Sequence, residues 1–497
     1  MTSLSETSIL SGSSGVTSGY TINQSIRFND GDNPVLYKSI SSTSTSTTNT
    51  ISMWVKRSKL GNSDSGSGSD AYGQTLFQSG RTASNYMELK FGGATAGGLG
   101  TAEDALSLYN VTGDSINMKI NTNAVFRDVS AWYHIVAIFD TTNGVPGQRL
   151  RLYVNGVRQT NFSSSTFPSA DTATEMFNNT SNTPSIGAVK NTSETVRHFD
   201  GYLAEIHVVN GYAYGPEYFG QIQEDTNIWV PIKYSSSYGT NGFYIKGSNS
   251  GSLGADSSGN GNNFTTSGLA ANDQKIDTPT NNQITFNPLN NQRSGGTPSN
   301  GNLDYEGPGT RTVISLTANI PSTGKWAIAF KVAAVSTNAG WNFGITKATN
   351  SNFGDAAGSN EDVGGQDNDG LHMSPSSSDL QLYDYTTSTS IDPSLPITTS
   401  DEFWLAVDMA TGKCFLGIYD ESATSMKFVA ADTGLDGNPA TGDNPTTTIS
   451  DMIGSNEYTF AVGSKDTSND IYLQRSTEVS GTTPSGYTYF ENVKDIL

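Results

Sequence analysis

Short windows in which apolar and polar residues alternate recur along the chain and predict β-strands. Two clear windows have the apolar positions Ile51, Met53, Val55, Leu150, Leu152 and Val154. Residues 133–139 are apolar on both faces, as expected of a central strand covered by a second sheet. Asn155 and Gly156 follow the second window and predict a type I′ hairpin, which needs positive φ at both central residues.

The second half of the chain shows the same alternation. Its clearest strand has the apolar positions Trp326, Ile328, Phe330 and Val332. Residues 403–409 and 415–419 predict a hairpin across 410–413, and 216–219 is expected to make one short turn. No long amphipathic helix is visible. We therefore predict an all-β protein made of two tandem antiparallel β-sandwiches.

Three segments of the first half have a recognisable order. Ala131–His134 leads into the apolar strand, Leu152–Gly156 ends in the hairpin turn, and Asp200–Ile206 reads DGYLAEI. This order resembles the laminin-G/concanavalin-A-like jelly roll, in the version found in virion proteins of tailed bacteriophages, many from marine hosts. The resemblance implies a position on the particle surface and loops that bind glycans or proteins.

The second half resembles a SPRY-type β-sandwich at Gly324–Trp326, at Gly344–Ile345 and in the 401–419 hairpin. The Gly-, Asn- and Ser-rich stretch between the halves has an order of phrases found in the same phage proteins. It is too polar to hold a core alone, so we expect it to pack against its neighbours. The expected organisation is a flexible N-terminal arm at 1–18, a concanavalin-A/laminin-G-like sandwich at 19–221, a connector at 222–300 and a SPRY-like β-sandwich at 301–497.

The charge balance disfavours two classes of partner. The 497 residues include 27 Lys and Arg against 47 Asp and Glu, a formal net charge of −20. Such a surface repels phosphate backbones and anionic lipid, so we expect neither nucleic acid binding nor membrane insertion. Cys414 is the only cysteine, which excludes an intrachain disulfide. The first residues lack the pattern of a signal peptide, so we expect synthesis in the host cytoplasm.

No catalytic motif is visible. Glucanases of the concanavalin-A-like class carry paired carboxylates as Glu-x-Asp-x-x-Glu on one strand, and no Glu of this chain is followed by Asp two positions later. Glu205 lies in a predicted strand beside His207 and is expected to be structural, with ligand contact as the alternative. His134 and His207 are expected to be buried or sheet-face histidines. We therefore expect no enzymatic activity and no catalytic residues.

Calcium is the one cofactor for which the sequence offers candidate ligands. Asp367 and Asp369 lie in the Gly-rich loop DNDG and group hard oxygen ligands of the kind that Ca²⁺ prefers. The spacing is too short for an EF-hand, and the closing Glu is missing. Asp256 opens the turn DSSGN, which is similar to the DxSGxG phrase of laminin-G-like domains, and is a second candidate.

One leading hypothesis and two alternatives follow. The leading hypothesis is a non-enzymatic phage virion structural protein, either a capsid-decorating fibre or knob or a tail appendage. It would bind host-surface glycan or a neighbouring virion protein, and Tyr and Trp on loops would stack on sugar rings. The alternatives are a secreted polysaccharide-binding or polysaccharide-degrading protein and a purely architectural particle protein. A homotrimer is expected, because phage appendages occupy symmetric positions.

Overall fold

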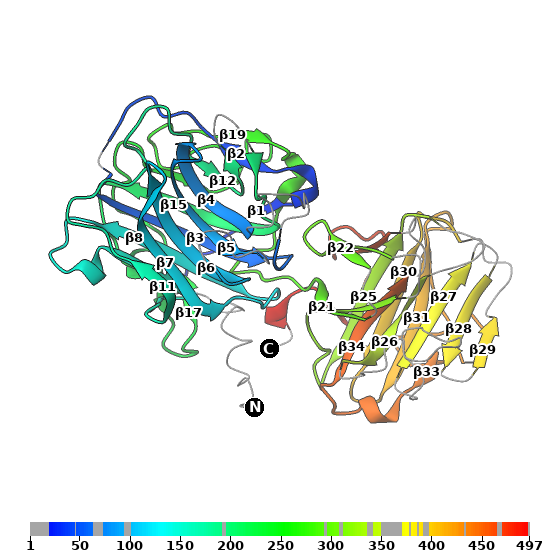
Figure 1. Cartoon of the computed structure of the whole chain (residues 1–497). Helices are drawn as coiled ribbons and strands as arrows, with labels where there is room; N and C mark the ends of the chain where they lie inside the picture. Colours follow the sequence, from blue (N-terminus) through cyan, green and yellow to red (C-terminus); the bar gives the residue numbers. More distant parts are fainter. Residues whose placement is uncertain are drawn as a thin grey trace. The chain divides into compact units, whose positions relative to one another are not determined.

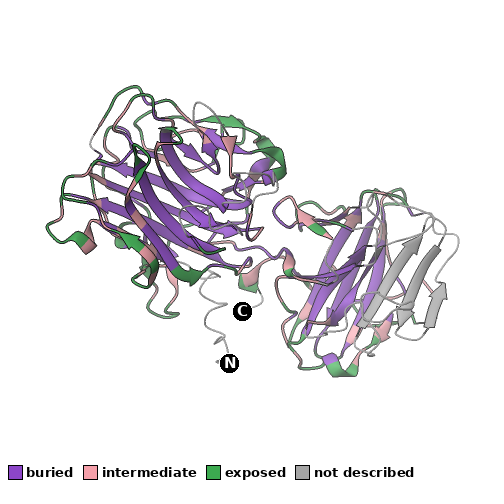
Figure 2. Cartoon of the chain, viewed as in Figure 1, coloured by how far each residue is buried: buried purple, intermediate pink, exposed green. Residues whose placement is uncertain are grey.

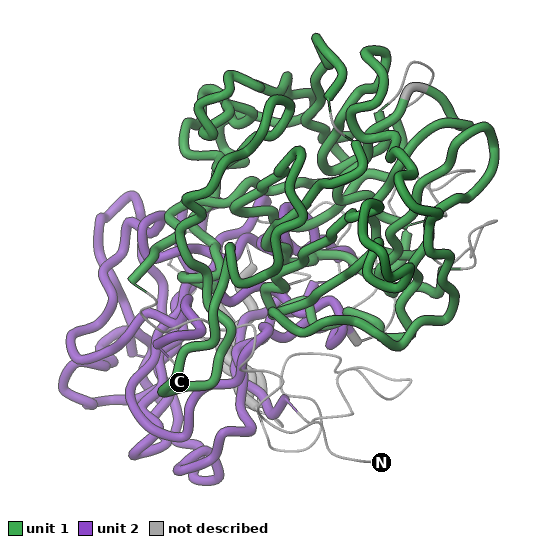
Figure 3. The backbone as a smooth tube through the Cα atoms, turned by 90° about the vertical axis from the view of Figure 1, so that its left-hand side faces the viewer, with its two compact units in different colours: residues 1–282 green, residues 283–497 purple. Residues whose placement is uncertain are grey.

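In a computed structural model, the chain forms two compact units, residues 1–282 and residues 283–497 (Figure 3). The structure describes residues 19–44, 46–62, 73–93, 101–190, 195–292, 296–307, 312–334, 341–348, 370–376, 379–384, 387–390, 397–431, 434–464 and 470–495. The helices of these residues are single 3₁₀ turns, and none has the length and apolar character needed to cross a membrane. The prediction of an all-β protein with two sandwiches is confirmed.

The elements of the first unit are β1 (Ser25–Phe28), η1 (Asp30–Asp32), β2 (Val35–Tyr37), β3 (Thr48–Arg57), β4 (Gly73–Thr82), β5 (Asn85–Gly92), β6 (Ala105–Thr112), β7 (Ser115–Val125), β8 (Trp132–Asp140), η4 (Pro146–Gln148), β9 (Leu150–Val154), β10 (Val157–Arg158), β11 (Phe162–Thr166), β12 (Ser185–Ile186), β13 (Val189–Lys190), β14 (Thr195–Val196), β15 (Gly201–Asn210), η5 (Pro216–Tyr218), β16 (Gly220–Ile222), β17 (Trp229–Pro231), β18 (Phe243–Ile245), β19 (Thr265–Ser267), η6 (Ala271–Asp273) and β20 (Gln274–Lys275).

The elements of the second unit are β21 (Phe286–Gln292), β22 (Thr297–Ser299), β23 (Asp304–Glu306), β24 (Thr312–Leu316), β25 (Lys325–Val332), β26 (Trp341–Lys347), β27 (Gly370–Ser376), β28 (Asp379–Asp384), β29 (Thr387–Ser390), β30 (Glu402–Asp408), β31 (Lys413–Asp420), β32 (Ser425–Phe428), β33 (Thr447–Thr448), η7 (Ser450–Met452), β34 (Tyr458–Ser464), β35 (Ile471–Leu473), β36 (Thr488–Tyr489) and η8 (Val493–Asp495).

Two large sheets face each other in the first unit (Figure 1). The β3 sheet has the order β10-β9-β8-β3-β15-β1-β20, with β18 paired to β15, and the β5 sheet has the order β11-β7-β6-β5-β4-β12-β2-β19. Their facing sides bury one apolar core that includes Ile51, Leu89 and Ile135 (Figure 2). The alternation predicted at 51–56 and 150–154 therefore marks the core-facing sides of β3 and β9.

The outer face of the β3 sheet is covered by the chain that follows β15. Phe219 and Tyr234 pack on Val136 of β8 in a second apolar cluster. A buried ion pair joins the same cover to the sheet, with Lys56 Nζ 2.8 Å from Asp277 Oδ2. The β3 sheet therefore has no open face among its central strands.

The segment 222–300, expected as one connector, is divided between the two units. Its first part contributes β17 to β20 to the first unit, and residues from 283 onward begin the second unit with β21 and β22. The Gly, Asn and Ser residues of the segment build turns. A few anchors such as Trp229, Phe243 and Phe264 supply the buried surface.

The second unit is also a sandwich of two sheets. One has the order β21-β24-β34-β26-β27-β28-β29, and the other has the order β22-β23-β35-β25-β30-β31-β32, with β33 paired to β31 and β36 to β25. Ile328, Phe343 and Leu405 lie in the core between them. The hairpin predicted around 410–413 is the β30–β31 pair, in which Val407 faces Cys414.

The predicted type I′ turn joins β9 to β10. Asn155 and Gly156 have φ angles of 48° and 76°, and Val154 pairs with Val157 across the turn. The ring of Trp229 lies directly over Gly156. The turn is therefore constrained by backbone geometry and by a packed aromatic ring.

Gly156→Ala is expected to destabilise the protein more than Gly113→Ala. Both glycines have positive φ, 76° and 57°, so each alanine costs about 1 kcal/mol in backbone strain. An added Cβ would lie 2.5 Å from the Trp229 ring at Gly156 but would meet nothing within 4 Å at Gly113. Urea denaturation measures both variants. Equal losses would mean that Trp229 moves aside at no cost.

Candidate functional site

A row of polar side chains crosses the outer face of the β5 sheet. In β5 the side chain of Leu89 points into the core, so that of Glu88 points outward. The strand register places Glu88 opposite Gln78 of β4 and Tyr109 of β6, and Tyr109 opposite Lys119 of β7. We call Lys119, Tyr109, Glu88 and Gln78 the polar row.

Glu88 is the centre of the polar row and is fully buried. Its carboxylate accepts hydrogen bonds from the hydroxyl groups of Thr75 and Tyr109. Arg197 Nη1 donates to Glu88 Oε2 at 2.7 Å. Lys90 Nζ lies 5.8 Å from the centre of the Tyr109 ring. Two hydroxyls and two cations therefore surround one carboxylate.

These neighbours set the ionisation of the polar row. Burial by itself would raise the pKa of Glu88, but the Arg197 and Lys90 charges and the hydroxyl hydrogen bonds hold that pKa below its usual value. Burial lowers the pKa of Lys90 to about 8, against the opposing effect of Glu88. Burial and the Glu88 charge raise the pKa of Tyr109. At neutral pH Glu88 is therefore an ionised hydrogen-bond acceptor.

Among the described residues of this face, those at the rim are open to solvent. Glu88 and Tyr109 are 0% exposed, whereas Tyr86, Lys119 and Arg197 are partly exposed. The Tyr86 ring meets the Tyr109 ring edge-on, with 5.6 Å between their centres. A ligand on this face would meet an aromatic ring, an ammonium and a guanidinium. Such groups suit the ring faces and hydroxyls of sugars.

Arg197→Met is expected to lower the free energy of unfolding by about 3 kcal/mol, because it removes the cation hydrogen-bonded to the buried Glu88 carboxylate. The control is Arg127→Met. The Arg127 side chain is 51% exposed, and its partner Asp104 keeps Arg57, so the loss should stay below about 1 kcal/mol. Chemical denaturation at pH 7 compares the variants, and equal losses would contradict the importance of the Arg197–Glu88 pair.

Glu205 lies on the other sheet, in strand β15 of the β3 sheet, beneath its outer cover. A β-bulge between Ala204 and His207 gives Glu205 a φ of 49°. Its carboxylate accepts hydrogen bonds from Tyr244 at 2.5 Å and Tyr20 at 2.8 Å, and lies 3.5 Å from His207 Nε2. Burial would raise the pKa of Glu205, but these partners hold it below its usual value. Glu205, only 3% exposed, joins the cover and Tyr20 to the sheet.

His134 forms a hydrogen-bonded pair with Ser52, but the pair cannot act as base and nucleophile. The ring of His134 lies between those of Trp54 and Trp229. The Trp229 indole N–H can only donate, so His134 Nδ1 accepts at 2.9 Å and Nε2 carries the ring proton toward Ser52 Oγ at 2.8 Å. Burial, together with nearby His207, lowers the pKa of His134 to about 3. The ring therefore stays neutral and directs its proton at the serine.

Asp30 and Asp200 bring two buried carboxyl groups together. The Asp30 N–H donates to Asp200 Oδ2 at 3.2 Å, and Lys59 Nζ lies 3.1 Å from Asp30 Oδ2. Burial, followed by the negative charge of Asp30, raises the pKa of Asp200 to about 8. Near neutral pH the pair therefore retains a proton between its carboxyl groups, which makes it a poor cation site.

Asp200→Asn is expected to raise stability above that of wild type, and the gain is expected to be larger at pH 8 than at pH 5. Between the usual aspartate pKa and about 8, folded Asp200 holds a proton that the unfolded chain has lost, so wild-type stability falls as pH rises through this window. Asparagine mimics the protonated acid and removes this dependence. Urea denaturation at both pH values tests it, with exposed Asp225→Asn as control. A pH-independent difference would contradict the shared proton.

The two calcium candidates have different outcomes. The carboxylate of Asp256 is already hydrogen-bonded within its own turn. It accepts the N–H of Ser258 at 2.9 Å, and it accepts the Ser258 hydroxyl and the Asn262 N–H at 2.8 Å each. Asp367 and Asp369 lie outside the described residues. Within the described part of the chain, no group of three or more His, Cys, Asp or Glu side chains is placed to hold a metal ion.

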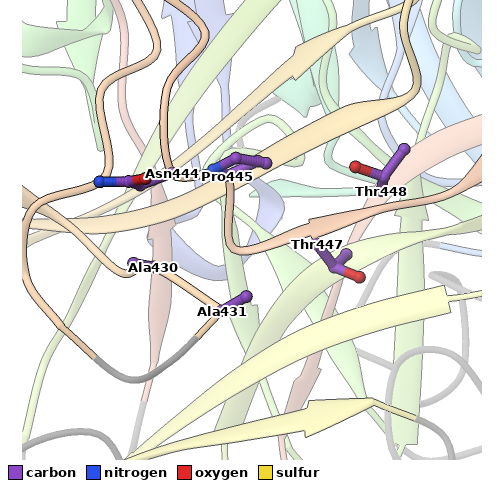
Figure 4. Close-up of a pocket in the computed structure, with 6 residues that line it drawn as sticks. All are labelled: Ala430, Ala431, Asn444, Pro445, Thr447 and Thr448. Carbon is purple, nitrogen blue, oxygen red and sulfur yellow. The ribbon is translucent and has the colours of Figure 1, made fainter.

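A hollow of about 490 Å³ lies in the second unit (Figure 4). It is lined by Ala430, Ala431, Asn444, Pro445, Thr447 and Thr448. The volume is in the range of small-molecule sites, but these six side chains include neither a charge nor an aromatic ring. The polar row and its rim, by contrast, offer a ligand charged groups and aromatic rings.

Residues 29–214 match the family model of the concanavalin A-like lectin/glucanases superfamily. The first unit has a concanavalin A-like fold. One similar structure is a Bacteroides ovatus protein described as a putative carbohydrate binding protein, with 18% identity, 52% of this chain and 60% of that chain covered, and a TM-score of 0.33. Another is domains LG4-5 of the mouse laminin α1 chain, with 9% identity, 96% of this chain and 89% of that chain covered, and a TM-score of 0.29. A third is the TRIM65 PSpry domain, with 11% identity, 39% of this chain and 92% of that chain covered, and a TM-score of 0.27. The chain thus spans 60% of the length of the Bacteroides protein. Curated proteins give no match.

The SPRY-like assignment of the second unit stays a prediction. In the concanavalin A-like unit, Glu88 and Arg197 carry no motif that singles them out in the sequence, and they lie 109 positions apart. One signal was present in β5, where Tyr86, Glu88 and Lys90 alternate with apolar residues. That alternation indicates a polar sheet face, but it does not identify the cation that reaches it.

Proposed function

We propose that the protein is a non-enzymatic structural protein of a bacteriophage particle. It is made in the host cytoplasm and exposed on the particle as a capsid-decorating fibre or knob or as a tail appendage. There it binds host-surface glycan, with other virion proteins and further copies of itself as partners. The order of the DGYLAEI segment and its neighbours in the sequence supports the phage part of this proposal.

The polar row carries the binding part of the proposal. Its rim presents Tyr86, Lys119 and Arg197 on one face of a concanavalin A-like unit. The guanidinium and ammonium donate to sugar hydroxyls, and the tyrosine ring offers an apolar surface to a sugar ring. The buried Glu88 fixes the position of Arg197 before any ligand arrives.

The ionisation of Glu88 and Glu205, two of the buried glutamates, supports the absence of glycosidase activity. Glycoside hydrolysis needs one carboxylic acid that donates a proton and a second carboxylate across the scissile bond. The pKa values of Glu88 and Glu205 are both held below their usual range. They also lie on different sheets, each among hydrogen-bond donors, so neither supplies the acid.

A glycan array with the purified protein tests the proposal. We expect wild type to bind a subset of oligosaccharides, and Tyr86→Ala with Lys119→Ala to weaken that binding at least tenfold. Lys233→Ala, an exposed lysine in the β3 sheet's cover, is the control. Bound glycans should be recovered uncut by mass spectrometry. Released reducing sugar would favour a polysaccharide-degrading protein, and an array without hits would favour an architectural one.

A further inference from the structure

Three tyrosine rings form a stack on the cover of the β3 sheet, away from the polar row. Tyr214 is the middle ring, with its centre 5.2 Å from that of Tyr212 and 4.2 Å from that of Tyr218. The interplanar angles are 3° and 25°. Tyr212 and Tyr218 are 41% and 39% exposed, whereas most large apolar side chains among the described residues are buried. We call these three residues the tyrosine stack.

The backbone beneath the tyrosine stack is fixed by one buried side chain. Thr50 of β3 is 0% exposed, and its hydroxyl accepts the Tyr214 N–H at 2.9 Å. The same hydroxyl donates to the carbonyl groups of Tyr212 and Tyr214, at 3.0 and 3.3 Å. Because the rings are already held in place, a ligand that binds them orders little further chain.

Packing below the stack adds to this rigidity. Tyr214 also meets Tyr234, with 6.3 Å between ring centres, and Tyr234 stacks on Phe219 at 4.9 Å. Phe219 and Tyr234 belong to the buried cluster on Val136. The stack therefore continues an aromatic cluster that begins at the sheet and ends in solvent.

We propose that the tyrosine stack is a second carbohydrate-binding site, and that its ligand is an uncharged pyranose glycan. Tyrosine rings offer flat apolar faces to the axial C–H groups of a pyranose, and their hydroxyls lie at the rim to bond sugar hydroxyls. The inference extends the proposed glycan binding to a surface on the other sheet from the polar row.

The charge near the stack selects against acidic sugars. Glu217 is exposed between Tyr214 and Tyr218 in sequence, and its carboxylate folds back against Gly215. The whole chain has a net charge of −20. A uronate or sialate bound beside Tyr218 would carry the same charge as Glu217, its neighbour in sequence, whereas a neutral sugar carries no charge to be repelled.

The size of the patch favours a sugar over a protein partner. Among the described residues 211–245, the exposed large apolar side chains are Tyr212, Tyr218 and Ile222. A stable protein interface needs about 800 Å² on each partner around an apolar centre. Two exposed rings give far less than that, but they match one or two sugar residues.

The test uses the full-length protein on an array of neutral oligosaccharides and matched oligosaccharides that carry uronate or sialate. Wild type should bind neutral members, and Tyr212→Ala with Tyr218→Ala should weaken those signals at least tenfold. Tyr212→Phe with Tyr218→Phe keeps the rings and should stay within about threefold of wild type. Val145→Ala, a 58% exposed side chain in the same unit, should change nothing.

The reciprocal variants separate this inference from the proposed function. Glycan signals that disappear in Tyr86→Ala with Lys119→Ala but persist in Tyr212→Ala with Tyr218→Ala would overturn the second site and leave the first standing. Loss of neutral-glycan signals only in the tyrosine-stack variant supports the second site. Signals from acidic members that disappear in Tyr212→Ala with Tyr218→Ala would overturn the ligand class. Wild type that binds no glycan at all would overturn both proposals.

Discussion

The carboxylate of Asp277 joins the cover of the β3 sheet to two of its central strands. It accepts the Lys56 ammonium at 2.8 Å and the Trp132 indole N–H at 3.0 Å, from the adjacent strands β3 and β8. Lys56 and Asp277 are 1% and 2% exposed. A buried ammonium without a partner would cost several kcal/mol or lose its proton, so this face of the sheet cannot exist without the segment that brings Asp277.

The two outer faces of the first unit differ as a consequence. On the β3 sheet the central strands present Trp54, Trp132 and Val136, and the chain after β15 must cover them. On the β5 sheet the corresponding positions are polar and satisfy one another around Glu88. The two proposed binding sites therefore differ in kind: one is a polar sheet face, and the other is a set of aromatic rings of the cover that reach solvent.

How much of this the sequence predicts depends on the range of the interaction. The type I′ turn at Asn155–Gly156 and the strand alternation at 51–56 are local, and both are confirmed. The extent of the first unit was not predicted, because its cover is rich in Gly, Asn and Ser. The overall polarity of this segment does not reveal the few residues that anchor it, such as Asp277. The hydrogen-bond partners of Asp277 lie more than 140 positions away in the sequence.

The candidate site shows the same limit. The polar alternation of β5 can be read from the sequence, but Arg197 follows β14, which pairs with β13 beside β4, and this long-range placement cannot. The tyrosine stack is easier to predict from the sequence, because Tyr212, Tyr214 and Tyr218 lie within seven residues. The sequence does not predict which of these rings are exposed, since Phe219 in the same segment is buried. Which ring is covered depends on the path of the backbone that Thr50 fixes.

The size of the tyrosine stack also limits how tightly one copy can bind. Each aromatic contact contributes about 1 kcal/mol beyond buried area, so two open rings give one copy only weak affinity. Weak sites become effective when many are displayed together, because each further contact forms at high effective concentration. A stack of this size is therefore of little use to a single free copy, and the proposed display in many copies on a particle would supply the repetition that weak sites need.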